Sequence, residues 1–251
     1  MKKVIITGTS RGIGFELAQI FAKQDFEVLA ISRNNKPLKK LQIKNIISIS
    51  VDLSKKDDLE KVRNYVHKNW KEVDILIHNA GFLIHKPFKD LTKEDFLKVY
   101  DVNVFGVAEL TRACIPFLKK GSHVLTISSM GGIQGSLKFS GLAAYSSAKG
   151  AVITLSELLA EEYKEQKIAF NVLALGAVQT EMLAEAFPDY KAPLEANEMA
   201  DYIYHFATTG QKFYNGKILQ DTKFEITNIN ILDYDIPYTP LLNCNFIPEW
   251  S

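Results

Sequence analysis

The sequence begins with an apolar segment that runs directly into a cluster of glycines and then into a helical pattern. Residues 3–7 are mostly apolar, and Gly8, Gly12 and Gly14 follow at once. Apolar residues then recur at helical spacing, at Ile13, Leu17, Ile20 and Phe21. This order predicts a strand, a tight turn, and a helix beginning near Gly12. Glycine lets the backbone turn sharply and a helix N-terminus attracts anions, so the turn could hold a pyrophosphate. A tight turn between two packed elements also needs glycine for structural reasons alone.

The rest of the chain alternates between predicted strands and helices. Near-continuous apolar runs predict strands at 3–7, 27–32, 46–51, 73–78, 123–128, 168–174 and 217–220. Between them we expect a helix at 55–69 with Ser54 as its N-cap, a long helix at 92–119 disturbed near Pro116, and at most two helical turns within 34–45. This alternation predicts an α/β fold with a doubly wound parallel sheet in a single domain. A ligand then binds at the carboxyl ends of the strands.

Tyr145 and Lys149 stand four residues apart within a helical pattern, so their side chains lie on one face, one turn apart. Bringing a phenol into its working range at pH 7 takes roughly 4 kcal/mol. An ammonium roughly 4 Å from the phenol oxygen supplies about that much at an effective dielectric near 20. The pair therefore suggests a tyrosine that acts as general acid or base. The alternative is an aromatic residue with a lysine stem packed beside it.

Composition narrows the class of protein. The chain has 251 residues, 47% of them hydrophobic, which suits one large α/β domain. Its formal net charge is +1 with the cations spread along the chain, so we expect no nucleic-acid partner and no membrane partner. Cys114 and Cys244 are its only cysteines and its five histidines lack metal-ligand spacing, so we expect neither a disulfide framework nor a metal site. Lys2 and Lys3 lead straight into a strand, which indicates neither a signal peptide nor a membrane helix; we expect a cytoplasmic protein.

Four motifs together resemble those of the short-chain dehydrogenase/reductase family. They stand in the family's order, in segments 7–14, 79–81 (Asn-Ala-Gly), 103–106 (Asn-Val-Phe-Gly) and 145–149 (Tyr-Ser-Ser-Ala-Lys), and the resemblance runs from about residue 2 to residue 220. It implies a Rossmann-type sheet and an enzyme that transfers a hydride between a nicotinamide cofactor and a carbonyl or alcohol substrate. It also implies a homodimer or homotetramer that pairs through the helices of residues 92–119 and 147–164.

The resemblance assigns the catalytic roles to four residues. Tyr145 passes a proton to the substrate oxygen, and Lys149 holds the phenol and the nicotinamide ribose. Asn103 sits in a locally disturbed helix and completes a proton relay, although an asparagine there can also be a poor helix former with a structural bond. Ser128 and Ser129 end a strand and face opposite sides, so only one can face the substrate. The family pattern selects Ser129.

The end of the second strand predicts the cofactor. Members that prefer NAD usually carry an acidic residue there, whereas this strand ends in Ser32-Arg33. Together with Arg11 in the glycine turn, Ser32 and Arg33 suit the 2′-phosphate of NADP(H), unless both arginines are simply solvated surface charges. Asp52 resembles the family's adenine contact, but is nearly as well explained as a turn residue ahead of Ser54. The remaining cofactor-binding positions implied by the resemblance are Gly8, Ser10, Gly12, Ile13, Gly14, Leu53, Asn79, Ala80, Gly81, Tyr145, Lys149, Gly176, Val178 and Thr180.

The sequence departs from the family pattern at several points. Ser129 and Tyr145 are sixteen positions apart, longer than usual, and residues 131–136 suggest an inserted, flexible stretch beside the substrate. His78 replaces a common asparagine, and Leu175 stands where proline is common. Residues 181–200 correspond to the family's substrate lid, although their apolar side chains could equally belong to the core.

The chain continues beyond the usual end of the family, and we treat residues 1–220 as the nucleotide-binding domain and 221–251 as a C-terminal extension. The large apolar residues toward the end of the extension favour burial against the domain or a partner; they include Tyr234, Tyr238, Leu241, Leu242, Phe246, Ile247 and Trp250. Two alternatives to an enzyme follow. One is a catalytically silent NADP(H)-binding regulator, and the other is a structural protein assembled through the extension.

Overall fold

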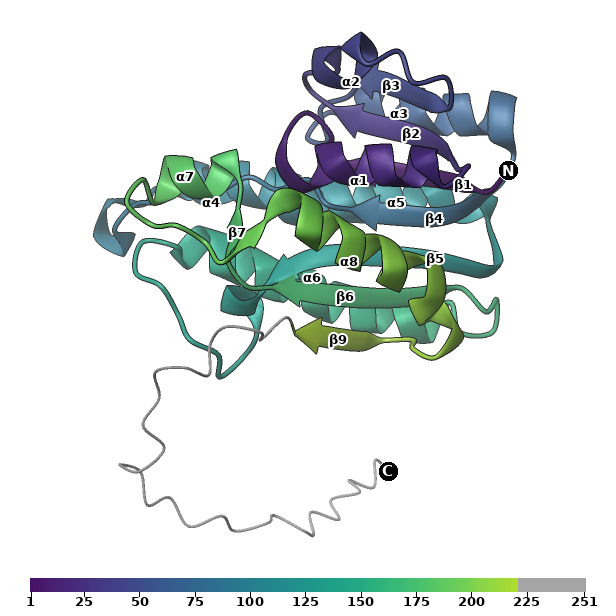
Figure 1. Cartoon of the computed structure of the whole chain (residues 1–251). Helices are drawn as coiled ribbons and strands as arrows, with labels where there is room; N and C mark the ends of the chain where they lie inside the picture. Colours follow the sequence, from purple (N-terminus) through teal and green to yellow (C-terminus); the bar gives the residue numbers. More distant parts are fainter. Residues whose placement is uncertain (221–251) are drawn as a thin grey trace, which may run out of the picture. The chain divides into compact units, whose positions relative to one another are not determined.

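A computed structural model describes residues 1–220, and the predicted extension 221–251 lies outside the described residues. Seven parallel strands form the central sheet, in the order β3-β2-β1-β4-β5-β6-β9 (Figure 1). The strands are β1 (Lys3–Thr7), β2 (Glu27–Ser32), β3 (Ile46–Ser50), β4 (Val73–His78), β5 (Leu118–Ser129), β6 (Ala169–Leu175) and β9 (Lys217–Gln220). This is the Rossmann-type doubly wound sheet that the sequence predicted. β1 stands at the switch point, where the strand order reverses between β2 and β4.

Helices cover both faces of the sheet, which explains why its strands read as continuous apolar runs. On β1, Val4 and Ile6 belong to the core formed with α1 (Gly12–Lys23) and α8 (Ala196–Thr209), whereas Ile5 belongs to the core formed with α3 (Lys56–Tyr65) and α5 (Gly106–Cys114). In Figure 1, α1 and α8 lie in front of the sheet and α3, α5 and α6 (Ala143–Glu162) lie behind it. The residues of β1 from Val4 to Thr7 are therefore buried, and the polar side chains of the site stand at the strand ends.

The predicted helix at 92–119 is interrupted. It consists of α4 (Lys93–Tyr100), a π-helical turn at Asp101–Phe105 and α5, followed by a 3₁₀ turn at Ile115–Phe117. A proline lacks an N–H and clashes with the preceding turn, so Pro116 ends the helix rather than disturbing it. β5 then begins at Leu118, five residues earlier than predicted, because Leu118 pairs with Val73 although the residues after it are exposed.

Smaller elements complete the described chain. The helix α2 (Lys36–Lys40) is short, as predicted for the link between the second and third strands. Ser54 does not cap α3, because its hydroxyl donates to Asp52 Oδ1 at 2.7 Å and Lys55 stands at the N-cap instead. The helix predicted at 55–69 consists of α3 followed directly by a second π-helical turn at Val66–Trp70. β7 (Val178–Gln179) pairs with β8 (Leu194–Glu195), and α7 (Glu181–Ala186) lies between them in the chain.

Candidate active site

Two glycines of the first turn let strand and helix pack against the end of β4. A Cβ on Gly8 would stand 2.7 Å from the Cα of Ala80, and a Cβ on Gly14 would stand 2.4 Å from Asn79 Nδ2. Asn79 in turn donates from Nδ2 to the carbonyl oxygen of Thr7 at 3.0 Å. Gly8, Gly14, Asn79 and Ala80 therefore form one packed unit. Their shared role in this structure is to hold the turn in place.

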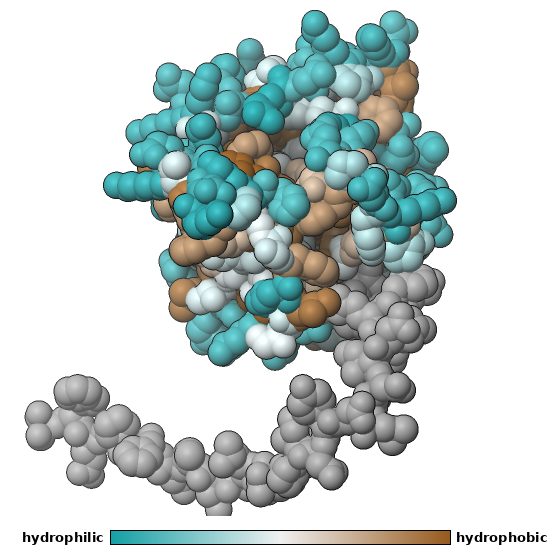
Figure 2. All heavy atoms as spheres, turned by 90° about the vertical axis from the view of Figure 1, so that its left-hand side faces the viewer, coloured by the Kyte–Doolittle hydropathy of each residue, from teal (hydrophilic) through white to brown (hydrophobic). Residues whose placement is uncertain are grey.

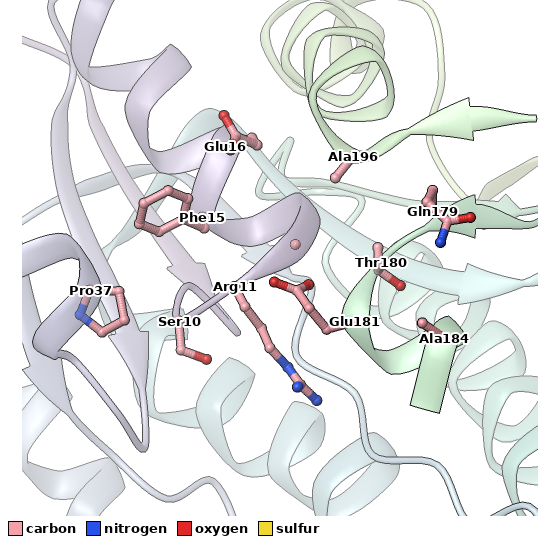
Figure 3. A pocket seen from close by; sticks show the side chains of 11 residues that line it. Ser10, Arg11, Phe15, Glu16, Pro37, Gln179, Thr180, Glu181, Ala184 and Ala196 are labelled. Carbon is pink, nitrogen blue, oxygen red and sulfur yellow. The ribbon is translucent and has the colours of Figure 1, made fainter. Parts of the chain in front are cut away.

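Gly12 instead faces a cavity at the N-terminus of α1. The cavity has a volume of about 510 Å³, and a Cβ on Gly12 would point toward Glu181 and Thr180 at 3.4 Å. Among the described residues no side chain caps α1, and its first turn holds no acidic residue, so its N–H groups are available to an anion. Figure 3 shows the cavity, whose lining residues are Ser10, Arg11, Gly12, Phe15, Glu16, Pro37, Gln179, Thr180, Glu181, Ala184 and Ala196.

The residues expected around an adenine ribose lie at the ends of β2 and β3. Ser32 is buried and its hydroxyl donates to the carbonyl oxygen of Asn34 at 2.9 Å, while Arg33 is exposed. The carboxylate of Asp52 accepts hydrogen bonds from the N–H and hydroxyl of Ser54 at 3.1 and 2.7 Å. Partial burial opposes ionisation of Asp52, but these hydrogen bonds and the charge of Arg33 hold its pKa below the usual value. Asp52 thus has the structural role in the turn that the sequence left open, and Leu53 beside it is buried.

Arg11 points toward α7. Its guanidinium forms a double hydrogen-bonded ion pair with Glu185, and Nη2 lies 3.0 Å from Glu185 Oε2. Glu185 was not predicted as a site residue from the sequence. Its spacing of four residues from Glu181 places both carboxylates on one face of a helix, but no helix was predicted at these positions.

Tyr145 and Lys149 lie on the first two turns of α6, as predicted. Lys149 is 5% exposed, and Nζ lies 5.6 Å from the centroid of the Tyr145 ring. It donates to the carbonyl oxygen of Ile127 at 2.7 Å. Burial raises the pKa of Tyr145 to about 12 and lowers that of Lys149 to about 8. Burial therefore shifts the pKa of the phenol in the direction opposite to the one expected from a neighbouring ammonium.

The two serines that end β5 face opposite sides. Ser128 is buried, and its hydroxyl donates to the carbonyl oxygen of Lys149 at 2.8 Å, so it ties β5 to α6. Ser129 accepts from the N–H of Gly131 at 3.2 Å. A Cβ on Gly131 would stand 3.7 Å from Ser129 Oγ and 2.9 Å from Ser146 Oγ. Ser129 therefore lies beside the first turn of α6, next to the residue that follows Tyr145.

Asn103 lies in the π-helical turn between α4 and α5 and is 1% exposed. Its Nδ2 donates to the carbonyl oxygens of Phe82 and Val99 at 2.7 and 2.9 Å, and its Oδ1 accepts from the N–H of Phe82 at 3.1 Å. A Cβ on Gly81 would stand 3.3 Å from Asn103 Oδ1 and 3.8 Å from Lys149 Nζ. Asn103 Oδ1 and Lys149 Nζ therefore both lie close to Gly81. The structural bond that the sequence left open as an alternative is present.

His78, the last residue of β4, is 2% exposed. Its Nε2 is 2.8 Å from Thr111 Oγ1. Burial, with a smaller contribution from the charge of Lys149, lowers the pKa of His78 to about 3. A neutral imidazole therefore stands where the family commonly has asparagine, and it adds no charge to the site.

The segment after β6 lies close to Gly12 in the first turn and to Gly81 beside Lys149. Gly176 is half-buried and Val178 is buried in β7. Thr180 Oγ1 accepts from the N–H of Leu183 at 3.3 Å and so caps α7. The Cε of Met182 would lie 3.8 Å from a Cβ on Gly81, next to Lys149 and Asn103.

The segment between Ser129 and Tyr145 is only partly the flexible stretch that the sequence suggested. A Cβ on Gly132 would stand 2.6 Å from the carbonyl carbon of Lys149, so the first part of this segment packs tightly on α6. Gly135 has no neighbouring atom that a Cβ would touch. At the far end, the Lys86 N–H donates to the carbonyl oxygen of Gly141 at 3.0 Å, which joins the segment to the loop after β4.

The site residues described above lie at the face formed by the carboxyl ends of the strands. In Figure 2, hydrophobic residues gather around a hollow on this face and hydrophilic residues surround them. The described part of the chain contains no cluster of three or more His, Cys, Asp or Glu side chains suited to a metal ion. Within residues 1–220, none of the helices combines the length and apolarity needed to span a bilayer.

Comparisons with known proteins agree with this geometry. The profile of the short chain dehydrogenase family matches residues 2–191, and the chain belongs to that family. A glucose 1-dehydrogenase from Gluconobacter oxydans is 31% identical over 238 residues, which cover 87% of this chain and 89% of that protein. Versicolorin reductase 1 from Dothistroma septosporum is 29% identical over 197 residues, covering 75% of this chain and 74% of the relative.

Solved structures show the same architecture. A 3-ketoacyl-(acyl-carrier-protein) reductase from Brucella melitensis, complexed with NADH, superimposes with a TM-score of 0.78 at 26% identity and covers 87% of this chain and 96% of that chain. A short chain dehydrogenase from Shigella flexneri, complexed with NADP, superimposes with a TM-score of 0.79 at 24% identity, covering 87% and 96% of the two chains. The second likeness concerns the fold alone.

Proposed function

We propose that this protein is an oxidoreductase that transfers a hydride between NADP(H) and a small to medium, apolar carbonyl or alcohol substrate. The main support for the proposal is that Lys149 Nζ and Asn103 Oδ1 both lie close to Gly81. Tyr145 lies on the same helix face as Lys149. This group lies at the same edge of the sheet as the cavity at the α1 N-terminus. Family membership and the cofactor complexes of the similar structures support the same assignment.

The residues around the cavity fit a dinucleotide. The uncapped N-terminus of α1 suits a pyrophosphate, and the exposed Arg33 at the end of β2 suits a 2′-phosphate. Val178 and Thr180 stand where the family contacts the nicotinamide amide. When bound, the cofactor supplies the hydride, and the protein supplies orientation and electrostatics.

The catalytic residues have distinct tasks in this proposal. Ser129 donates a hydrogen bond to the substrate oxygen, and Tyr145 passes that oxygen a proton. Burial raises the pKa of Tyr145 to about 12, so the phenol is protonated at pH 7 and carries the proton that it passes to the substrate oxygen. Lys149 places a positive charge beside the phenol as it loses its proton. Asn103 holds the backbone of Phe82, the neighbour of Gly81, which lies close to Lys149 Nζ.

Replacing Tyr145 with phenylalanine tests the role of the phenol. We expect Tyr145→Phe to lower kcat/KM about a hundred- to ten-thousandfold because only the proton donor is lost, while the Kd for NADPH stays unchanged. Turnover is measured as NADPH oxidation against a panel of ketones and aldehydes. Tyr163→Phe is the matched control, because Tyr163 stands just beyond the far end of α6.

A Tyr145→Phe variant that keeps more than about half of the wild-type kcat/KM would show that the proton comes from another group. Tight NADPH binding by the wild type with no turnover on any carbonyl would instead support the catalytically silent regulator. Cytoplasmic location and a homodimer or homotetramer remain part of the proposal, and fractionation and light scattering measure them.

A further inference from the structure

An ion pair joins α7 to the glycine turn beside the cavity at the N-terminus of α1. Arg11 and Glu185 are 174 positions apart in the chain, yet their side chains form the double hydrogen-bonded pair described above. Of the two side chains, Arg11 is 46% exposed and Glu185 is 63% exposed. The pair therefore lies at the surface, where a ligand phosphate can reach the guanidinium.

A second carboxylate from the same face of α7 reaches the same turn. Glu181 Oε2 would lie 3.4 Å from a Cβ on Gly12. Figure 3 shows Glu181 and Arg11 close together between the glycine turn and α7. The hydrogen bond from Arg11 to Glu185, followed by the charges of Glu185 and Glu181, raises the pKa of Arg11. Both carboxylates thus favour a guanidinium turned toward α7.

The two arginines expected to bind a 2′-phosphate therefore differ in their surroundings. Within residues 1–220, the Arg33 side chain forms no ion pair, whereas both terminal nitrogens of Arg11 are engaged by one carboxylate. The edge of a guanidinium formed by Nη1 and Nη2 fits one carboxylate or one phosphate with two parallel hydrogen bonds, and it cannot serve both in this way at once. A phosphate that binds this edge of Arg11 must first displace Glu185, and one that binds the other edge is repelled by the nearby charge of Glu185.

We infer that Glu185 is a specificity-determining residue for the cofactor, acting through Arg11. The inference rests on the proposed function and deepens it. NADPH carries the 2′-phosphate that competes with Glu185 for Arg11, and NADH does not. Glu185 therefore weakens NADPH binding selectively and narrows the preference for NADPH over NADH that Arg11 and Arg33 create.

The test measures the Kd of NADPH and of NADH for the full-length protein by titration calorimetry at low salt. An exposed ion pair contributes little, so we expect Glu185→Gln to tighten NADPH binding about two- to fivefold and to leave NADH binding unchanged. Because the effect passes through Arg11, we expect it to vanish when Glu185→Gln is combined with Arg11→Ala.

Two further variants serve as controls. Glu181→Gln removes a carboxylate that acts on Arg11 through its charge, so we expect it to favour NADPH by less than Glu185→Gln does. Glu109→Gln breaks the exposed ion pair with Arg112 on α5 and should change neither. Together they separate a local effect of charge from one that depends on the 2′-phosphate.

Equal tightening of both cofactors by Glu185→Gln, no tightening at all, or tightening that persists without Arg11 would overturn the inference and leave the oxidoreductase assignment standing. A wild-type protein that binds neither NADPH nor NADH would refute the inference and the proposed function together.

Discussion

Replacing Lys149 with methionine is expected to make the folded protein more stable while it removes turnover. The ammonium of Lys149 is almost fully buried, and burial lowers its pKa from 10.5 to about 8. The charged form of this lysine is therefore less stable in the folded protein than in the unfolded chain. A methionine has a similar length and no charge, so it fits the same space without this penalty.

The size of the effect follows from the pKa. At ~1.4 kcal/mol per pKa unit, the change from 10.5 to about 8 corresponds to about 3 kcal/mol. The variant also loses the hydrogen bond from Nζ to the carbonyl oxygen of Ile127, which offsets about 1–2 kcal/mol. We expect a net gain of about 1–2 kcal/mol in the free energy of unfolding at pH 7. For a domain of this size, that raises Tm by a few degrees.

The advantage of methionine depends on pH in a defined direction. Below pH 8 the lysine is protonated in both states, and the full penalty applies. Between pH 8 and 10.5 the folded lysine loses its proton first, so the unfolded chain binds more protons and wild-type stability rises relative to the variant. The difference between Lys149→Met and the wild type should therefore shrink across this range.

Urea unfolding of both proteins at pH 7, 9 and 10.5 measures the difference directly. Lys138→Met serves as the control, because Lys138 is an exposed lysine and its replacement should give no such pH-dependent gain. A Lys149→Met variant that is less stable than the wild type at pH 7, or a gain that is the same at every pH, would refute the reasoning. Activity is measured in parallel and should be lost.

Two further predictions concern the cofactor and the C-terminal extension. Arg33→Ala should weaken NADPH binding about ten- to a hundredfold, the worth of a charge-assisted phosphate contact, and leave NADH binding nearly unchanged; equal losses for both cofactors would contradict the NADP(H) assignment. Removing residues 222–251 leaves the compact unit Met1–Asp221 whole and should lower either Tm or the oligomer mass from light scattering, because the large apolar residues of the extension favour burial. If neither quantity changes, the extension contributes nothing to stability or assembly.

The sheet could be predicted from the sequence because its strands are buried on both faces and so read as apolar runs. β5 shows the limit of this signal. Its first residues after Leu118 are exposed and polar, and only the pairing of Leu118 with Val73 makes them part of a strand. Ser54 shows another limit, since one hydroxyl can either cap a helix or bond to Asp52, and the local sequence allows both.

The candidate site was predictable where spacing on one element decides the geometry. Tyr145 and Lys149 share a helix face by their separation alone, and the alternation of a strand separates Ser128 from Ser129. The partner of Arg11 was not predictable in this way, because Glu185 lies 174 positions away on a short helix. Nor did spacing indicate the electrostatics of Tyr145, whose pKa depends on how deeply the folded chain buries it.

The π-helical turn at Asp101–Phe105 sets the angular phase between α4 and α5. It holds one residue more than an α-helical turn, and the amide of Asn103 donates to the carbonyl oxygen of Val99 there. Deleting a single residue from this turn would restore regular α-helix and remove the wide turn in which Asn103 bonds to Phe82 and Val99. The length of this short stretch is therefore as fixed as its chemistry, and substitutions at Asn103 perturb the packing of α5 together with any proton relay.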